Sequence, residues 1–195
     1  MDVLRAFVAL EMPLAIQNAL REISADLKEK LNGLPLRWLP VENIHLTLKF
    51  LGEISENSLD SISALLEAQA NTIQPFEIRL AGTGVFPNAR RPNVVWVGMD
   101  APEDLLLLQQ RIEMDLSRLG YPAEQRKFSP HLTLARVQRN AHPRDLEHIG
   151  DAIKLLKVVT SAAALVDKIT LFSSELRSSG AVYHPLSQSR FAAAT

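Results

Sequence analysis

The tetrapeptide His45-Leu46-Thr47-Leu48 occurs twice in this chain, and its second copy is His131-Leu132-Thr133-Leu134. Successive side chains of a β-strand point to opposite faces, so each copy places its histidine and threonine on one face and its two leucines on the other. The leucines can enter a core while the imidazole and the hydroxyl face a groove. The repeat therefore predicts two His-x-Thr strands, one in each half of the chain.

The hydrophobic pattern around the two motifs repeats as well. Each half reads strand, helix, His-x-Thr strand, helix, strand. This order predicts an α+β fold with two pseudo-symmetric lobes, whose antiparallel sheets face a central cleft and whose helices lie outside. We expect residues 1–195 to form a single domain made of these two duplicated lobes. The expected elements are strands at 3–10, 44–51, 76–80, 94–99, 165–172 and 181–186, the second His-x-Thr strand after Pro130, helices at 16–31, 59–70, 105–119 and 146–156, and a loop at 82–92.

Composition excludes several classes of function. The chain has 195 residues, a net charge of −1 and no cysteine, so disulfides, thiolate metal sites and cysteine nucleophiles are ruled out. Balanced charge argues against bulk electrostatic binding of long nucleic acids, although a local basic site remains open. The first residues lack the pattern of a signal peptide, and no apolar run is long enough to cross a membrane. We therefore expect a cytoplasmic protein with no membrane partner.

Two histidines that face one groove suit acid–base chemistry. Histidine can give or take a proton near neutral pH, so one imidazole can act as general base and the other as general acid. Hydroxyls beside the imidazoles, those of Thr47 and Thr133, could donate hydrogen bonds to developing negative charge. Neither motif has a carboxylate or a third histidine at a usual ligand spacing, which disfavours a metal hydrolase.

These residues resemble the two-histidine (2H) phosphoesterase superfamily. More closely, the chain is similar to the bacterial and archaeal RNA 2′,3′-cyclic phosphodiesterases, once described as 2′–5′ RNA ligases. The similarity runs nearly end to end, although residues 183–191 match only loosely. It rests on RAFVAL at 5–10 followed by Pro13, RWLPVENIHLTLKFLG at 37–52, VWVG at 95–98, PHLTLAR at 130–136 and LFSSEL at 171–176.

The resemblance implies hydrolysis of a ribose 2′,3′-cyclic phosphate to a 2′-phosphate, without a metal or another cofactor. By analogy, His131 is the base that activates water and His45 is the acid on the ribose 3′-oxygen, although the pseudo-symmetry leaves the reverse assignment open. Thr47, Thr133 and Arg136 are the expected phosphate-binding residues. Simple alternation puts Arg136 on the leucine side, so it reaches the cleft only if the strand ends or bulges there. Expected substrates are RNA ends or nucleoside 2′,3′-cyclic phosphates, and we expect a monomer.

Other readings remain open at this point. The same site could run in the reverse, ligating direction, or the protein could bind RNA phosphate ends without turnover. Lys49 shares the parity of His45 and either lines the groove or is an ordinary surface residue. Phe50 and Phe86 either stack on a nucleobase or belong to the core.

Overall fold

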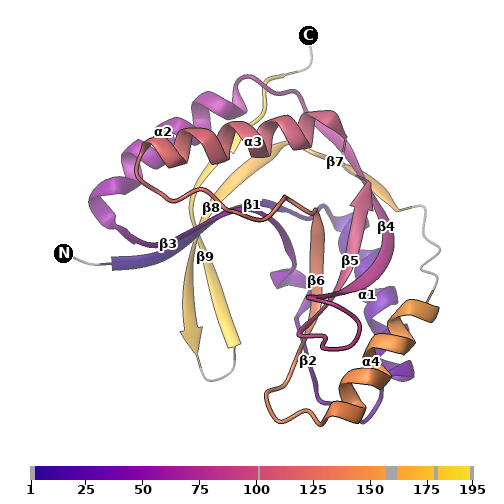
Figure 1. Ribbon diagram of the computed structural model, residues 1–195. Coiled ribbons are helices and arrows are strands. Elements are labelled where there is room, and N and C mark those ends of the chain that lie inside the picture. Colours follow the sequence, from indigo (N-terminus) through magenta and orange to yellow (C-terminus); the bar gives the residue numbers. More distant parts are fainter. Residues whose placement is uncertain (1–2, 101, 157–161, 178–179, 194–195) are drawn as a thin grey trace.

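The computed structural model describes residues 3–100, 102–156, 162–177 and 180–193 (Figure 1). Most elements fall where the hydrophobic pattern predicts them. In chain order they are β1 (Val3–Glu11), α1 (Leu14–Lys30), β2 (Leu36–Trp38), the 3-10 helix η1 (Val41–Asn43), β3 (His45–Ser55), the 3-10 helix η2 (Glu56–Ser58), α2 (Leu59–Ala70), β4 (Phe76–Phe86), β5 (Val94–Asp100), α3 (Glu103–Arg118), β6 (His131–Val137), α4 (Pro143–Leu155), β7 (Ala163–Val166), β8 (Lys168–Arg177) and β9 (Gly180–Arg190).

The strands form two antiparallel sheets, which confirms the predicted α+β architecture. The first sheet has the order β3-β1-β8-β9 and the second has the order β2-β6-β5-β4-β7. Each His-x-Thr strand pairs with the opening strand of its own half, β3 with β1 and β6 with β5. Four of the remaining strands are exchanged: β8 and β9 join the first sheet, while β2 and β4 join the second, and only β7 stays in the sheet of its own half. Neither sheet is therefore built from one half alone.

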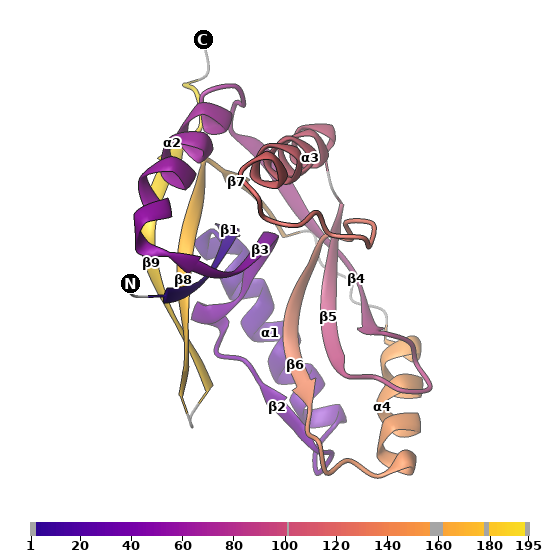
Figure 2. The same ribbon diagram turned by 60° about the vertical axis from the view of Figure 1, so that its left-hand side comes forward.

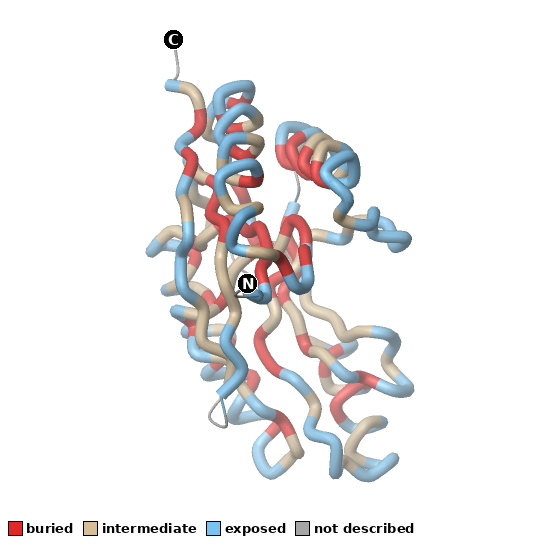
Figure 3. Tube along the Cα trace, turned by 90° about the vertical axis from the view of Figure 1, so that its left-hand side faces the viewer, coloured by how far each residue is buried: buried red, intermediate tan, exposed pale blue. Residues whose placement is uncertain are grey.

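The helices cover the apolar faces of the sheets. Helix α2 packs on β8 and β9, α3 packs on α2 and β3, α4 packs on β4, and α1 contacts β7. Figures 1 and 2 show α2 and α3 side by side at one end of the molecule and α4 at the other. Buried positions gather in the strands and on the inner faces of the helices (Figure 3).

A β-bulge interrupts each His-x-Thr strand at the same place. In β3, Thr47 pairs with Ala9 and Lys49 with Val8, so Leu48 is the extra residue. In β6, the fourth residue of the motif, Leu134, is likewise the extra one in its pairing with β5. An extra residue reverses the alternation of faces beyond it. The fifth residue after each histidine therefore returns to the histidine's face.

Several strands are longer than predicted, and in two of them glycines form further irregularities instead of ending the strand. Gly52 has a φ of +72° and lies at a register shift, and β3 continues to Ser55. The expected loop at 82–92 begins only after Phe86. Strand β4 has a shift in its register with β5 at Gly82 and continues beyond it to Phe86. Gly84 is required within it, since a Cβ there would lie 2.2 Å from the ring of Trp96.

The single strand expected at 165–172 is instead two strands in different sheets. Strand β7 pairs with β4, whereas β8 pairs with β1. The chain passes between the sheets at Asp167, whose carbonyl accepts a hydrogen bond from the Phe191 N–H at 2.7 Å. Its carboxylate also pairs with Arg190 at 3.2 Å. The change of sheet is therefore held by both the backbone and the side chain of one residue.

Candidate active site

Each histidine is the first residue of its strand and is held in the same way. The Nδ1 of His45 lies 2.9 Å from the carbonyl of Asn43, and that of His131 lies 2.7 Å from the carbonyl of Ser129. A carbonyl only accepts hydrogen bonds, so Nδ1 must carry a hydrogen in both rings. The other ring nitrogen, Nε2, is then left to exchange a proton with a ligand. The two sites are thus matched at the level of the backbone.

The faces of both strands follow the predicted alternation as far as the bulge. All four motif leucines are buried, whereas both histidines and both threonines are half-buried. The hydroxyls of Thr47 and Thr133 have no hydrogen-bond partner within the part of the chain that the structure describes. They can therefore donate to a ligand without breaking an existing bond.

Aromatic rings surround His45. The imidazole stacks on Phe7 with ring centroids 4.7 Å apart, lies 6.1 Å from Phe172 and meets Tyr183 edge-on at 5.0 Å. Burial lowers the pKa of His45 to about 4. The hydrogen bond from Nδ1 to the carbonyl of Asn43 favours the protonated ring and raises this pKa, but by less than burial lowers it. Without a ligand, His45 is neutral at physiological pH.

The positive charge of Arg136 lowers the pKa of His45 further. This is a direct link between the two sheets, since Arg136 lies on β6 and His45 on β3. The bulge at Leu134 accounts for it, because Ala135 turns into the core and Arg136 returns to the face of His131. Arg136 has no ion pair or hydrogen bond from its side chain within the described residues. Its guanidinium is therefore free to bind an anion.

His131 lies against a different pair of rings. Phe86 meets it edge-on at 4.9 Å, and Trp96 lies 6.3 Å away and is tilted. Trp96 comes from β5, which pairs with β6, and Phe86 comes from β4, the next strand of the second sheet. Phe86 therefore packs against a motif histidine, which was not among its predicted roles.

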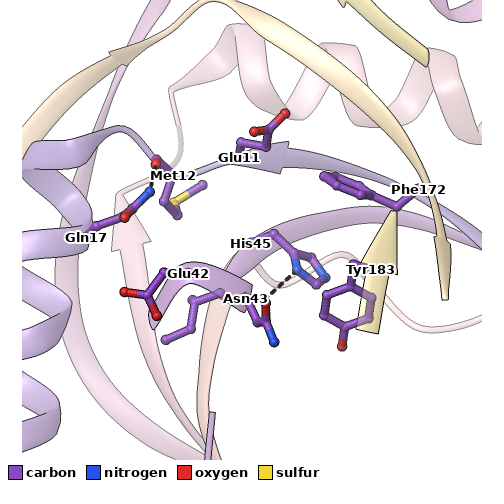
Figure 4. Close-up of a pocket in the computed structure, with 9 residues that line it drawn as sticks. Glu11, Met12, Gln17, Glu42, Asn43, His45, Phe172 and Tyr183 are labelled. Carbon is purple, nitrogen blue, oxygen red and sulfur yellow. Dashed lines mark hydrogen bonds between the residues drawn. The ribbon is translucent and has the colours of Figure 1, made fainter. Parts of the chain in front are cut away.

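A pocket of about 120 Å³ adjoins His45 (Figure 4). Glu11 is the less exposed of its two carboxylates. Burial raises the pKa of this carboxyl, but hydrogen bonds from Thr170, Lys168 and Gln188 and the charge of Lys168 lower it by more. An ionised Glu11 accepts hydrogen bonds and does not supply a proton. The pocket is lined by Glu11, Met12, Gln17, Glu42, Asn43, Ile44, His45, Phe172 and Tyr183.

Sequence reasoning missed most of this pocket. Phe172 and Tyr183 lie far from the motifs in sequence, and only the strand exchange brings β8 and β9 to His45. The sequence did indicate one aromatic neighbour of His45. Phe7 belongs to an apolar strand, but it is an even number of residues from the polar Arg5 and Glu11, so the three side chains share one face of that strand. That spacing puts Phe7 on the face opposite the core.

Lys49 does not line the groove. The bulge at Leu48 turns its side chain inward, where it is only 4% exposed and pairs with Glu113 on α3 and with the carbonyl of Pro122. Phe50, the next residue, takes the place in the first motif that Arg136 takes in the second. Its side chain is 68% exposed, with its ring 6.2 Å from that of Phe7.

Neither a metal cluster nor a membrane-spanning helix is found in the described part of the chain. Within the described residues, no three His, Cys, Asp or Glu side chains come together in a way that could hold a metal ion. Among the same residues, no helix has the length and apolar character needed to cross a lipid bilayer.

Comparisons with known proteins agree with the duplicated motif. The family model of LigT-like phosphoesterases matches this chain twice, at residues 10–96 and 97–183. The RNA 2′,3′-cyclic phosphodiesterase of Methanothermobacter thermautotrophicus is 33% identical over 92% of this chain and 94% of its own length. That of Aquifex aeolicus is 31% identical, with 94% and 95% covered.

Solved structures show the same arrangement. A crystal structure of a protein from Thermus thermophilus has a TM-score of 0.82 at 30% identity, covering 96% of this chain and 97% of that one. The structure of E. coli LigT complexed with 3′-AMP has a TM-score of 0.76 at 25% identity, covering 97% and 99%. The chain therefore belongs to the LigT-like phosphoesterase family.

Proposed function

We propose that this protein hydrolyses RNA 2′,3′-cyclic phosphate ends to 2′-phosphate ends by two-histidine acid–base catalysis, without a metal. The relatives named RNA 2′,3′-cyclic phosphodiesterase support the activity. The observation that carries the mechanism is the matched pair of imidazoles, each with Nδ1 bonded to a backbone carbonyl and Nε2 left for a ligand. A cyclic phosphate of this kind requires a ribose 2′-oxygen, which is why the substrate class is RNA.

The reaction needs one proton removed and one supplied. Nε2 of His131 takes a proton from water as the water oxygen attacks phosphorus. The bond from phosphorus to the 3′-oxygen breaks, and Nε2 of His45 gives that oxygen its proton. The products are a 2′-phosphomonoester and a 3′-hydroxyl. Thr47, Thr133 and Arg136 bind the phosphoryl oxygens, whose negative charge grows as the water attacks.

The substrate itself restores the acid form of His45. A pKa of about 4 leaves the free imidazole neutral at pH 7. A phosphate anion bound against His45 adds an opposite charge and screens Arg136, and both effects raise the pKa of the imidazole. Phosphate binding is therefore accompanied by proton uptake, which calorimetry in buffers of different ionisation enthalpy would measure.

The activity is tested with an oligoribonucleotide that ends in a 2′,3′-cyclic phosphate, incubated with the protein in excess EDTA. We expect complete conversion to a 2′-phosphate end, identified by its removal with a general phosphomonoesterase, which leaves the cyclic substrate intact, and by its resistance to a 3′-phosphate-specific phosphatase. The same oligonucleotide with a 3′-phosphate end is the control and stays unchanged. A 3′-phosphate product would contradict the acid–base geometry, and a reaction abolished by EDTA would favour a metal hydrolase. Adding an acceptor with a 5′-hydroxyl tests the ligating direction in the same assay.

A further inference from the structure

Two arginines lie directly opposite each other on neighbouring strands beside the motif strand β6. Arg37 of β2 is the cross-strand partner of Arg136 of β6, and both are exposed. Directly opposed residues of an antiparallel pair share one face of the sheet. Arg136 lies on the face of His131, so Arg37 lies there too, one strand farther from β5. Adjacent strands are about 4.8 Å apart, which sets the outward step from Arg136 to Arg37.

The backbone of Arg37 is firmly held in this position. The ladder between β2 and β6 is extended on both sides, by the Leu39 N–H donating to Leu134 and the Gln138 N–H donating to Pro35, each at 2.8 Å. Leu36, the residue before Arg37, is buried, and Trp38 after it lies under the ammonium of Lys28 at 5.8 Å. These neighbours anchor a three-residue strand whose one charged side chain points to the motif face.

Within the described part of the chain, no acidic group pairs with either of these arginines. Neither guanidinium has an ion pair or hydrogen bond within the described ranges of the chain. Glu42, the acidic residue that follows Arg37 most closely, is instead paired with Arg21 at 3.0 Å. Like charges directly opposed across two strands destabilise a sheet. An anion bound by both guanidinium groups would remove that cost.

We propose that Arg37, together with Arg136, binds the phosphodiester that joins the last two nucleotides of the RNA, next to the phosphate that reacts. This rests on the proposed function, which places the reacting phosphate between His45 and His131. An RNA chain carries one phosphate per nucleotide, so the next anion lies one step out from the reacting one. Guanidinium groups suit phosphate oxygens because they offer paired donors in a fixed plane. Arg37 therefore distinguishes RNA chains from single nucleotides, which lack this second phosphate.

The test measures affinity for two product ligands, an oligoribonucleotide with a 2′-phosphate end and a nucleoside 2′-monophosphate. In Arg37→Gln we expect affinity for the oligonucleotide to fall about tenfold or more, the usual size of a lost charge-assisted hydrogen bond. Affinity for the mononucleotide should change less than about twofold, because it makes no contact with Arg37. For the oligonucleotide, the slope of log affinity against log salt should fall by about 0.7, the value for one contact to a single-strand phosphate.

The matched control is Arg79→Gln, which removes another exposed arginine from the same sheet. Arg79 lies on β4 and already pairs with Glu77 at 2.8 Å, so we expect no change for either ligand. Arg37→Lys should restore part of the oligonucleotide affinity. Equal losses for both ligands, or no loss for the oligonucleotide, would overturn the proposal. If the wild type hydrolysed no cyclic phosphate, the proposed function would be wrong, but these affinities would still decide the role of Arg37.

Discussion

The two His-x-Thr motifs have the same sequence and the same backbone device, yet their surroundings differ. Both histidines bond a carbonyl two residues earlier through Nδ1, and both strands bulge at the fourth motif residue. His45, however, is enclosed by three rings, and its burial, aided by the positive charge of Arg136, lowers its pKa to about 4. His131 contacts two other rings. The residue of the first motif that is equivalent to Arg136 is Phe50, which carries no charge.

The difference comes from the strands beside the motifs. Opposite the histidine, β1 supplies Glu11 to His45 whereas β5 supplies Gly98 to His131. Opposite the threonine, β1 supplies Ala9 and β5 supplies Trp96. Duplication thus keeps the hydrogen bond that orients each imidazole, while the residues that face the two motifs differ. Two copies of one motif can in this way carry two different roles.

Replacing either motif histidine should have the largest effect on the activity. We expect His45→Ala and His131→Ala each to lower kcat by about 10²–10⁴-fold, the usual contribution of one general acid or base. Because the two groups act in one step, the double variant should lose little more than either single variant. Single-turnover hydrolysis of the cyclic phosphate measures all three rates.

The control for this series is His148→Ala, an exposed histidine of α4, which should retain wild-type turnover. Near-normal activity in His45→Ala or His131→Ala would remove that histidine from the mechanism. The two imidazoles would then not act as an acid–base pair. Fully multiplicative losses in the double variant would mean that the two imidazoles act in separate steps.

The enclosure of His45 should also appear in the stability of the free protein. Its pKa is about 4 in the folded state and near 6.5 in an unfolded chain, so between these values only the unfolded state takes up the proton. The free energy of unfolding must therefore decrease as the pH falls from about 6.5 to 4, by up to about 3 kcal/mol. Above pH 6.5 this contribution is fully present.

Urea unfolding of the wild type and His45→Asn over this pH range isolates the effect. Other titrating groups contribute to both proteins and cancel in the difference. We expect the wild type to lose stability relative to the variant as the pH falls. If the free energy of unfolding changed with pH in the same way in both proteins, His45 would not be buried as described here.

The sequence predicts the repeated part of this molecule well. The burial of the motif leucines and the positions of the helices both follow from periodicity. The bulges do not, because Leu48 and Leu134 look like any other alternating residue. For that reason simple alternation puts Lys49 on the wrong face, and it puts Arg136 on the histidine's face only if the strand bulges.

The strand exchange also lies beyond local sequence. Residues 165–172 carry one apolar pattern, but the chain changes sheets at Asp167, and a pattern cannot show to which sheet each part is added. The aromatic surroundings of His45 depend on that change, since Phe172 and Tyr183 reach it only through β8 and β9. The local sequence thus predicts which face each motif side chain occupies. It does not predict which side chains from other strands surround the histidines.

The smallest expected effect concerns the fifth residue after each histidine, Arg136 in one motif and Phe50 in the other. Arg136→Gln should weaken binding of a nucleoside 2′-monophosphate by about 2 kcal/mol, the loss of one charge-assisted hydrogen bond. It should also raise the pKa of His45 in the free protein, because the charge that disfavours the imidazolium is gone. An NMR titration of the His45 ring measures this shift.

Phe50→Leu is the matched change in the first motif, since it alters a side chain at the equivalent position but no charge. The pKa of His45 should keep its wild-type value there, because the burying rings and Arg136 both remain. Arg136 also differs from Arg37 in a testable way: its loss should weaken binding of mononucleotides as well as oligonucleotides, whereas loss of Arg37 affects only the longer ligand. An unchanged His45 titration in Arg136→Gln would show that the guanidinium does not reach across from β6 to β3. The two motifs would then be electrostatically independent, and the asymmetry of their histidines would come from the aromatic rings alone.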